Sequence, residues 1–176
     1  MQENRQSDMQ LIAWTVIIVT SVLFDQLSKS AVLNSPIADG MRAELWPGFI
    51  DFRYTRNEGA FFGMMDDKTL LLIIVSGIAL IGIAVWVFVE RKRIHPLTGI
   101  AVSMIIGGGI GNEIDRIAMG SVTDFIHFDF DFPVLHEFPI FNIADIYVTI
   151  GAVLLIVSVI GFDRKLFDDK EKKENE

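Results

Sequence analysis

The sequence predicts an all-α membrane protein with four transmembrane helices. Hydrophobic residues make up 51% of the 176-residue chain, and the mean hydropathy is +0.44. A soluble domain of this size is usually less apolar and distributes its apolar residues periodically. Here they stand in four largely unbroken runs, at residues 11–24, 70–89, 97–110 and 146–162. A helix needs about 20 mostly apolar residues to cross the hydrocarbon layer, so each run marks a predicted span.

One integral-membrane domain is expected to contain all four spans. The spans cover residues 11–31, 69–89, 97–118 and 143–162, with outer loops at 32–68 and 119–142 and a tail at 163–176. Only the second run is long enough by itself. The others must include flanking polar residues such as Asp25, Asn112 and Asp145. Since polar groups are costly in hydrocarbon, these side chains are expected at span ends or facing protein.

The first span is predicted to be a retained signal anchor. Its apolar run has the length of a signal-peptide core, but the preceding segment is not basic and no small-residue cleavage site follows. The polar segment Asp25 to Lys29 follows instead.

The distribution of Lys and Arg predicts that both termini are cytoplasmic. Basic residues lie between the second and third spans, at 91–93, and in the tail. The loop from Gly120 to Asn142 has no Lys or Arg and is expected outside, whereas the 32–68 loop is mixed. Within that loop, residues 44–54 alternate and are rich in aromatic side chains, which indicates short strands or an interfacial segment on the outer leaflet.

Composition argues against several classes of site. The chain has no cysteine, so thiolate chemistry and disulfides are excluded, and its three histidines lack metal-ligand spacing. No metal and no cofactor are therefore expected. A net charge of −8 does not suit a nucleic-acid partner.

With this topology, the polar groups of the spans gather at the outer level. They come from the end of the first span, the end of the third, the loop after it and the start of the fourth: Asp25, Lys29, Asn112, Asp115, Arg116, Asp124, Asn142 and Asp145. A proton-coupled transporter would place polar groups through the whole depth of the membrane. A site that opens at the surface needs them at one level, and two carboxylates there could share a proton and activate water.

Each of these residues also has a structural explanation. Asp25 and Lys29 have the i,i+4 spacing of a helical ion pair. Asn142 could be the N-cap of the last helix, with Asp145 completing a capping box. Asp115 could simply neutralise a neighbouring cation. Gly107 and Gly111 have the spacing of a helix-packing surface.

Five motif blocks resemble the bacterial signal peptidase II family, the lipoprotein signal peptidases. They occur in the family's order, from the first span to the last: Asp25-Gln26-Leu27-Ser28-Lys29, Asn57-Glu58-Gly59-Ala60-Phe61, Gly107 to Arg116, Val122-Thr123-Asp124-Phe125 and Phe138 to Asp145. Two departures are mild: Gly109 stands where Ala is common, and Thr123 stands where Val is common.

The resemblance implies an aspartyl endopeptidase of the bacterial inner membrane. It would remove the signal peptide of diacylglyceryl-modified prolipoproteins, cutting before the lipidated cysteine, with Asp124 and Asp145 as the catalytic pair. The implied partners are these substrates and membrane lipid, with no obligatory protein partner. The residues expected to bind substrate are Asn57, Gly108, Asn112, Arg116 and Asn142, and those expected to support the site are Asp25, Lys29 and Asp115.

The resemblance also implies a small periplasmic β-like cradle in the outer loop and an interfacial segment that covers the substrate. No role is predicted for the acidic and aromatic stretch from His127 to Phe138.

Overall fold

The computed structural model describes residues 2–59, 68–129 and 138–163. Four long helices dominate it, and a short π-helical turn extends the last one: α1 Gln2–Leu33, α2 Lys68–Glu90, α3 Pro96–Met119, α4 Ile143–Ser158 and η1 Val159–Asp163. All four long helices have segments with the length and hydropathy of a membrane span. The predicted four-helix fold class is therefore confirmed.

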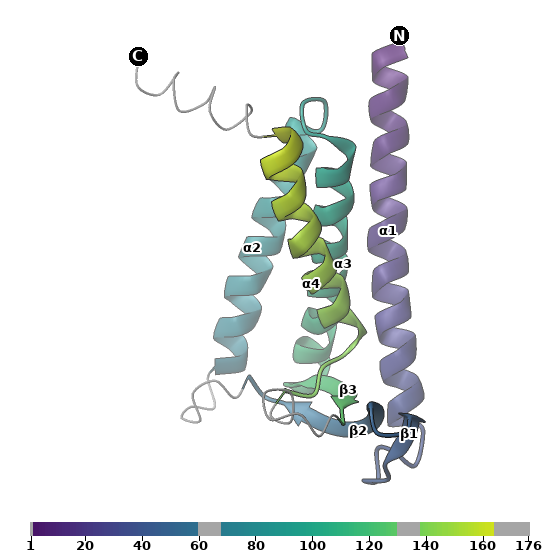
Figure 1. The fold of residues 1–176 in the computed structure, drawn as a ribbon. Coiled ribbons are helices and arrows are strands. Elements are labelled where there is room, and N and C mark those ends of the chain that lie inside the picture. The colour runs from purple at the N-terminus through teal and green to yellow at the C-terminus, as the bar shows by residue number, and fades with distance from the viewer. Residues whose placement is uncertain (1, 60–67, 130–137, 164–176) are drawn as a thin grey trace.

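The helix α3 is the centre of the bundle. It packs against α1, α2 and α4 (Figure 1), and 61% of its apolar window is buried, compared with 6–17% for the other three helices. Its first turn begins with Pro96, and the His95 ring accepts a hydrogen bond from the Leu97 N–H. Gly120 ends it in the left-handed conformation, with a φ of 72°.

Glycines allow the neighbouring helices to approach α3 closely. A Cβ on Gly108 would lie 2.4 Å from the Ala144 carbonyl oxygen of α4, and one on Gly111 would lie 2.4 Å from the Asp25 carboxylate of α1. A Cβ on Gly107 would meet Ser21 of α1. The pair Gly107 and Gly111 thus packs against α1, which is the packing role that their spacing indicates.

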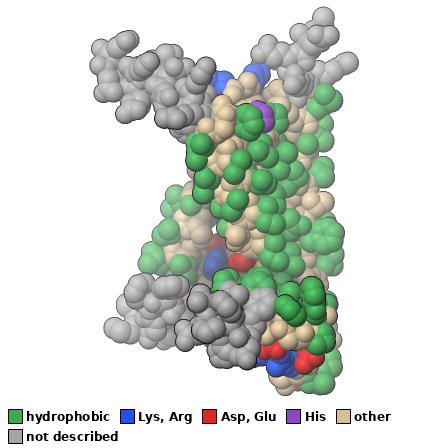
Figure 2. Space-filling view, viewed as in Figure 1, with side chains coloured by type: hydrophobic (Ala, Val, Ile, Leu, Met, Phe, Trp, Pro, Cys, Tyr) green, Lys and Arg blue, Asp and Glu red, His purple; other side chains and the backbone are tan. Residues whose placement is uncertain are grey.

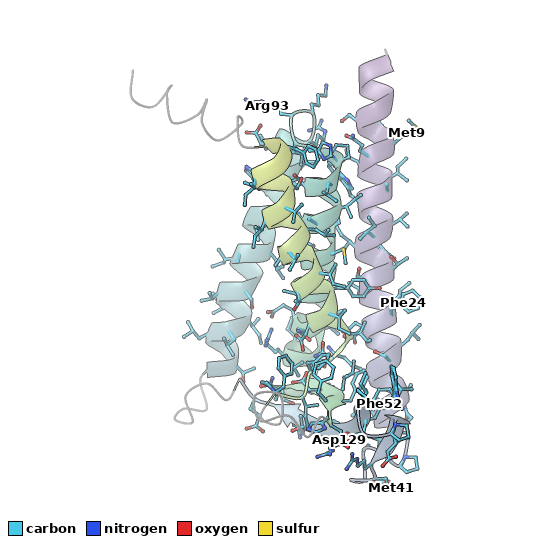
Figure 3. All side chains as sticks on the ribbon, in the orientation of Figure 1. Met9, Phe24, Met41, Phe52, Arg93 and Asp129 are labelled. Carbon is cyan, nitrogen blue, oxygen red and sulfur yellow. The ribbon has the colours of Figure 1, made fainter. Side chains whose placement is uncertain are left out.

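The outward faces of the helices are apolar, as a lipid-facing surface requires. Apolar side chains cover most of the helical surface in Figure 2. Phe24, for example, points away from the other helices and is 63% exposed (Figure 3). Every span has exposed aliphatic side chains, which form no hydrogen bonds with water. Contact with the hydrocarbon of a lipid bilayer is therefore more favourable for them than contact with water.

A three-stranded antiparallel sheet lies at one end of the bundle (Figure 1). Its strands, in the order β1-β2-β3, are Ala43–Trp46, Ile50–Asn57 and Val122–Phe128. The first two come from the 44–54 region, where strands were one of the two alternatives. The predicted covering segment belongs to the same loop, of which residues 60–67 lie outside the described residues, as do residues 130–137 and most of the predicted tail.

The two ends of the bundle differ in character. The start of α1, the end of α4 and the basic connection between α2 and α3 lie at the end opposite the sheet (Figure 1). Figure 3 places Arg93 at this end and Asp129 beside the sheet.

Candidate active site

Asp124 lies on β3, where the sheet meets the helices, and its side chain is buried. Its Oδ1 accepts a hydrogen bond from Asn142 Nδ2 at 2.6 Å, and its Oδ2 accepts one from Asn57 Nδ2 at 2.8 Å. The donors come from the N-terminus of α4 and the end of β2. Three separate chain segments therefore meet at this carboxylate.

Asp145 occupies the third position of α4 and completes a capping box with Asn142. Its Oδ2 accepts the Asn142 backbone N–H at 3.1 Å, and the Asn142 side-chain oxygen accepts the Asp145 N–H at 3.0 Å. The helix-cap explanation of these two residues is thus correct as geometry. The other oxygen, Oδ1, accepts from Asn112 Nδ2 at 2.9 Å and points toward α3.

The Asn142 side chain joins the two aspartates. Its amide nitrogen donates to Asp124 while its amide oxygen accepts from the backbone of Asp145. The same nitrogen lies 3.1 Å from Asn112 Oδ1. Asn142 has no exposed surface, so this bridge is shielded from water. The same set of hydrogen bonds therefore caps α4 and holds the two aspartates together.

Backbone pairing brings the two acidic segments side by side. Phe141, just before the N-cap of α4, accepts hydrogen bonds from the N–H groups of Phe125 and Ile126, and donates one to Ile126. This short bridge fixes the start of α4 against β3. This pairing brings together the segments of Asp124 and Asp145, which are 21 positions apart in the sequence.

The burial of Asp124 changes its acidity. Desolvation, with a smaller contribution from the charge of Asp145, raises the pKa of this carboxyl from 3.8 to about 6, against the hydrogen bonds from Asn57 and Asn142 and the charge of Lys29. An acid whose pKa lies near neutrality can both hold and release a proton under ordinary conditions. Asp124 therefore has the acidity that a general acid–base group needs.

A buried lysine cluster lies directly beside the acid pair. Lys29 Nζ contacts Asp25 Oδ2 at 2.8 Å, Asp115 Oδ2 at 3.2 Å and Asn112 Oδ1 at 2.9 Å. The two carboxylates together exceed the single positive charge, so the cluster also depends on hydrogen-bond donors. Gln26 supplies one, since its Nε2 is within 3.1 Å of both Asp25 and Asp115.

The two carboxylates of this cluster each hold a residue adjacent to a catalytic candidate. Asp25 Oδ1 accepts the Ala144 N–H at 3.0 Å, one residue before Asp145. Asp115 Oδ2 accepts the Thr123 N–H at 2.8 Å, one residue before Asp124. Lys29 and its partners thus connect α1 and α3 to both segments that carry the acid pair.

The remaining predicted residues lie at different distances from the pair. Asn57 and Asn112 contact it directly, as described above. Arg116 does not: among the described residues its ion pair is with Glu113, at 3.2 Å. Gly108 lies against α4, where its missing side chain makes room for the Ala144 carbonyl. The structure therefore gives Gly108 a packing role, and substrate contact by it stays a prediction.

The structure also brings together one cluster with metal-ligand chemistry. Asp51, His127 and Asp129 present ligand atoms within 4.8 Å of one another at the sheet. Arg42 and Arg53 form ion pairs with both carboxylates, so the negative charge that would attract a cation is already neutralised. The cluster holds β2 to the segment after β3.

The fold and the site together define a multi-pass membrane protein with paired carboxylates at one end of its helix bundle. The profile of the signal peptidase (SPase) II family matches residues 17–161. The chain belongs to this family.

Individual relatives agree with this placement. The lipoprotein signal peptidase of Symbiobacterium thermophilum is 37% identical over 150 residues, which cover 85% of this chain and 95% of the relative. That of Clostridium tetani is 37% identical over 156 residues, covering 86% and 97%. A solved bacterial membrane enzyme, 33% identical, superposes with a TM-score of 0.75 over 85% of this chain and 94% of its own.

We expect Asp115→Asn to damage stability more than chemistry. Lys29 keeps its ion pair with Asp25, but the amide removes its second charged partner and weakens the acceptor for the Thr123 N–H, a loss of about 2 kcal/mol. Thermal unfolding in detergent measures this loss, with the same change at the exposed Asp39 as the control. An unchanged unfolding midpoint together with lost cleavage would place Asp115 among the catalytic groups instead.

Proposed function

We propose that this chain is an endopeptidase that removes the signal peptide from diacylglyceryl-modified prolipoproteins, and that Asp124 and Asp145 perform the cleavage. Asn142 carries the proposal, because its side chain donates to the Asp124 carboxylate and its backbone N–H donates to the Asp145 carboxylate, so one residue holds two carboxylates from distant segments at one end of an apolar bundle. Relatives named lipoprotein signal peptidase, which match most of the chain, support the substrate class.

In the proposed mechanism the two aspartates share one proton. Close carboxylates do not both ionise cheaply, so one is the base and the other the acid. The ionised carboxylate takes a proton from water, and this water attacks the carbonyl carbon of the scissile peptide bond. The protonated carboxyl donates a hydrogen bond to the carbonyl oxygen, and a proton then passes to the leaving amine nitrogen as the C–N bond breaks.

The buried position of Asp124 favours its role as the acid. Burial raises the pKa of Asp124 to about 6, so it keeps a proton under mildly acidic conditions. Asp145 is less buried than Asp124, and we assign it the role of the base, with its two oxygens held by Asn112 and by the Asn142 backbone.

Asn57 and Arg116 are proposed to bind the substrate backbone, and Asn112 and Asn142 to line the site beside it. Asn57 is exposed at the end of β2 while contacting Asp124, so it borders the route by which a peptide would arrive. Asn112 and Asn142 keep the pair in position. Arg116 is partly exposed one helical turn beyond Asn112, where its guanidinium can donate to a substrate carbonyl.

We propose that the protein lies in the bacterial inner membrane as a single domain, with both termini cytoplasmic and the acid pair at the outer leaflet. Basic residues favour the cytoplasmic side, and Arg91, Lys92 and Arg93 lie at the end opposite the sheet. The charged groups visible where the helices meet the sheet in Figure 2 would then lie at the outer surface. Acyl chains of the substrate would stay in lipid while its backbone enters at this level.

A cleavage assay with the purified protein tests the proposal. The substrate is a synthetic peptide with a diacylglyceryl-modified cysteine, and the products are identified by mass spectrometry. We expect one cut directly before the modified cysteine, with chelator present and no other protein added. Equal cleavage of the unmodified peptide would contradict the proposed substrate class, and loss of cleavage with chelator would contradict the mechanism.

A further inference from the structure

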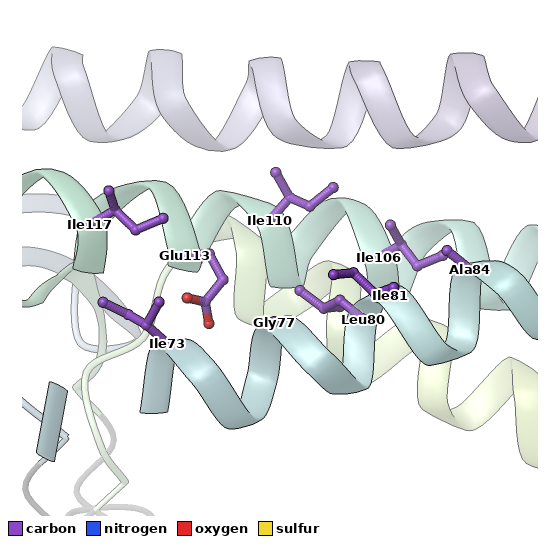
Figure 4. Close-up of a pocket in the computed structure, with 9 residues that line it drawn as sticks. All are labelled: Ile73, Gly77, Leu80, Ile81, Ala84, Ile106, Ile110, Glu113 and Ile117. Carbon is purple, nitrogen blue, oxygen red and sulfur yellow. The ribbon is translucent and has the colours of Figure 1, made fainter. Parts of the chain in front are cut away.

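Glu113 is a buried carboxylate that the acid pair and its supporting cluster do not use. It lies on α3, is 92% buried, and faces a groove of about 320 Å³ between α2 and α3 (Figure 4). All the other lining residues are aliphatic or glycine, among them Ile73 and Leu80 of α2 and Ile110 and Ile117 of α3. An ionisable group among such neighbours is costly, so it needs a reason to be there.

Two side chains hold one oxygen of this carboxylate. The Ser76 hydroxyl of α2 donates to Oε1, and Nη1 of Arg116 lies 3.2 Å from the same atom. The other oxygen, Oε2, is buried and has no hydrogen-bond partner among the described residues. Ser76 therefore anchors Glu113 from the neighbouring helix, and Glu113 in turn contacts the guanidinium.

The position of Arg116 makes this contact important for the site. Arg116 and Asn112 are spaced i,i+4 on α3, so they share a face of the helix. Asn112 contacts Asp145, so Arg116 starts one helical turn from a residue that holds the acid pair. Its side chain is 24% exposed and has no second ion pair among the residues that the structure describes. Without Glu113, a long flexible cation would be drawn to the next available carboxylates or to the polar surface.

We propose that Glu113 is a positioning residue, which holds Arg116 in the orientation that binds the substrate backbone. The proposal rests on the proposed function and adds a residue to it. Glu113 does not contact the acid pair, and its effect passes through Arg116. The loss of its charge should therefore weaken substrate binding more than it slows the chemical step.

The test is a double-mutant cycle on cleavage of the lipidated peptide. Glu113→Gln keeps the shape of the side chain and removes its charge. We expect kcat/KM to fall about tenfold, mostly through a higher KM. In an Arg116→Gln background the same substitution should change kcat/KM less than about twofold, since its target is gone. Glu44→Gln, at an exposed position of β1, is the matched control and should leave both constants unchanged.

The cycle separates positioning from simple stabilisation. A purely structural Glu113 would lower the unfolding midpoint, with equal losses in both backgrounds and no preference for KM. That result, or a wild-type KM for Glu113→Gln, would overturn the proposal. Failure of the proposed function looks different, because the unsubstituted protein itself would then not cleave the lipidated peptide.

Discussion

Asp124→Asn is expected to abolish cleavage while leaving a folded, membrane-inserted protein. The amide can neither donate the acid proton nor take up one from water, so kcat should fall about 10³-fold or more. Its size matches the carboxyl, and it can still accept a hydrogen bond from Asn142 or Asn57. Cleavage of the lipidated peptide measures activity, and Asp39→Asn is the control. Near-normal cleavage by Asp124→Asn would remove this residue from the proposed mechanism.

The same substitution is expected to stabilise the protein at neutral pH. The pKa of Asp124 is raised from 3.8 to about 6 in the folded protein, so folding favours the protonated form. This contribution to stability is complete below pH 3.8 and is lost as the pH rises to about 6. Ionisation of Asp124 at high pH therefore costs the wild type roughly 3 kcal/mol of folding free energy. The variant avoids this cost, but its gain is smaller because the amide has one hydrogen-bond acceptor fewer.

Thermal unfolding at two pH values checks this expectation. Asp124→Asn should unfold near the wild-type temperature at pH 4 and above it at pH 8. If the variant were less stable than the wild type only at pH 8, the ionised Asp124 would stabilise the fold. That result would contradict the raised pKa of Asp124.

Asp145→Asn is expected to abolish cleavage as well, but with a different effect on stability. Its carboxylate accepts one hydrogen bond on each oxygen, from Asn112 and from the Asn142 backbone, and an amide can accept only on its single oxygen. The capping box is therefore weakened, at a cost of about 1 kcal/mol. The activity should nevertheless fall about 10³-fold or more, because the base is gone.

This variant distinguishes the two roles of Asp145. If Asp145 were only a helix cap, Asp145→Asn would cleave normally once corrected for the folded fraction. Lost cleavage with a small change in the unfolding midpoint is the expected combination.

The membrane fold was predictable because its signal is local. Long apolar runs specify spans without reference to the rest of the chain, and alternation marked the 44–54 region for strands or an interfacial segment. That Asp124 and Asp145 lie at the same end of the bundle also followed from the order of the spans. The bridge did not, because it depends on Phe141 pairing with Ile126 and on one rotamer of Asn142.

The position of Asp145 in the sequence fits both a helix cap and a catalytic role. The capping box is present. The Asp145 carboxylate that completes it also accepts a hydrogen bond from Asn112, and Asn142, the N-cap, donates to Asp124. Both explanations can hold for one residue, which spacing alone does not reveal.

Two polar residues were missed for different reasons. Gln26 follows a charged residue in a helix, and nothing in its spacing indicates that it would reach across to Asp115. Glu113 did carry a signal, since it is an ionisable residue inside the predicted third span.

The most direct test of the account is the pH dependence of kcat/KM for the lipidated peptide. The central claim is that Asp124 and Asp145 share one proton, and kcat/KM reports the ionisation of the free enzyme. Burial raises the pKa of Asp124 to about 6, so kcat/KM should fall about tenfold for each pH unit well above 6. A constant or rising kcat/KM between pH 5 and pH 8 would contradict the shared proton.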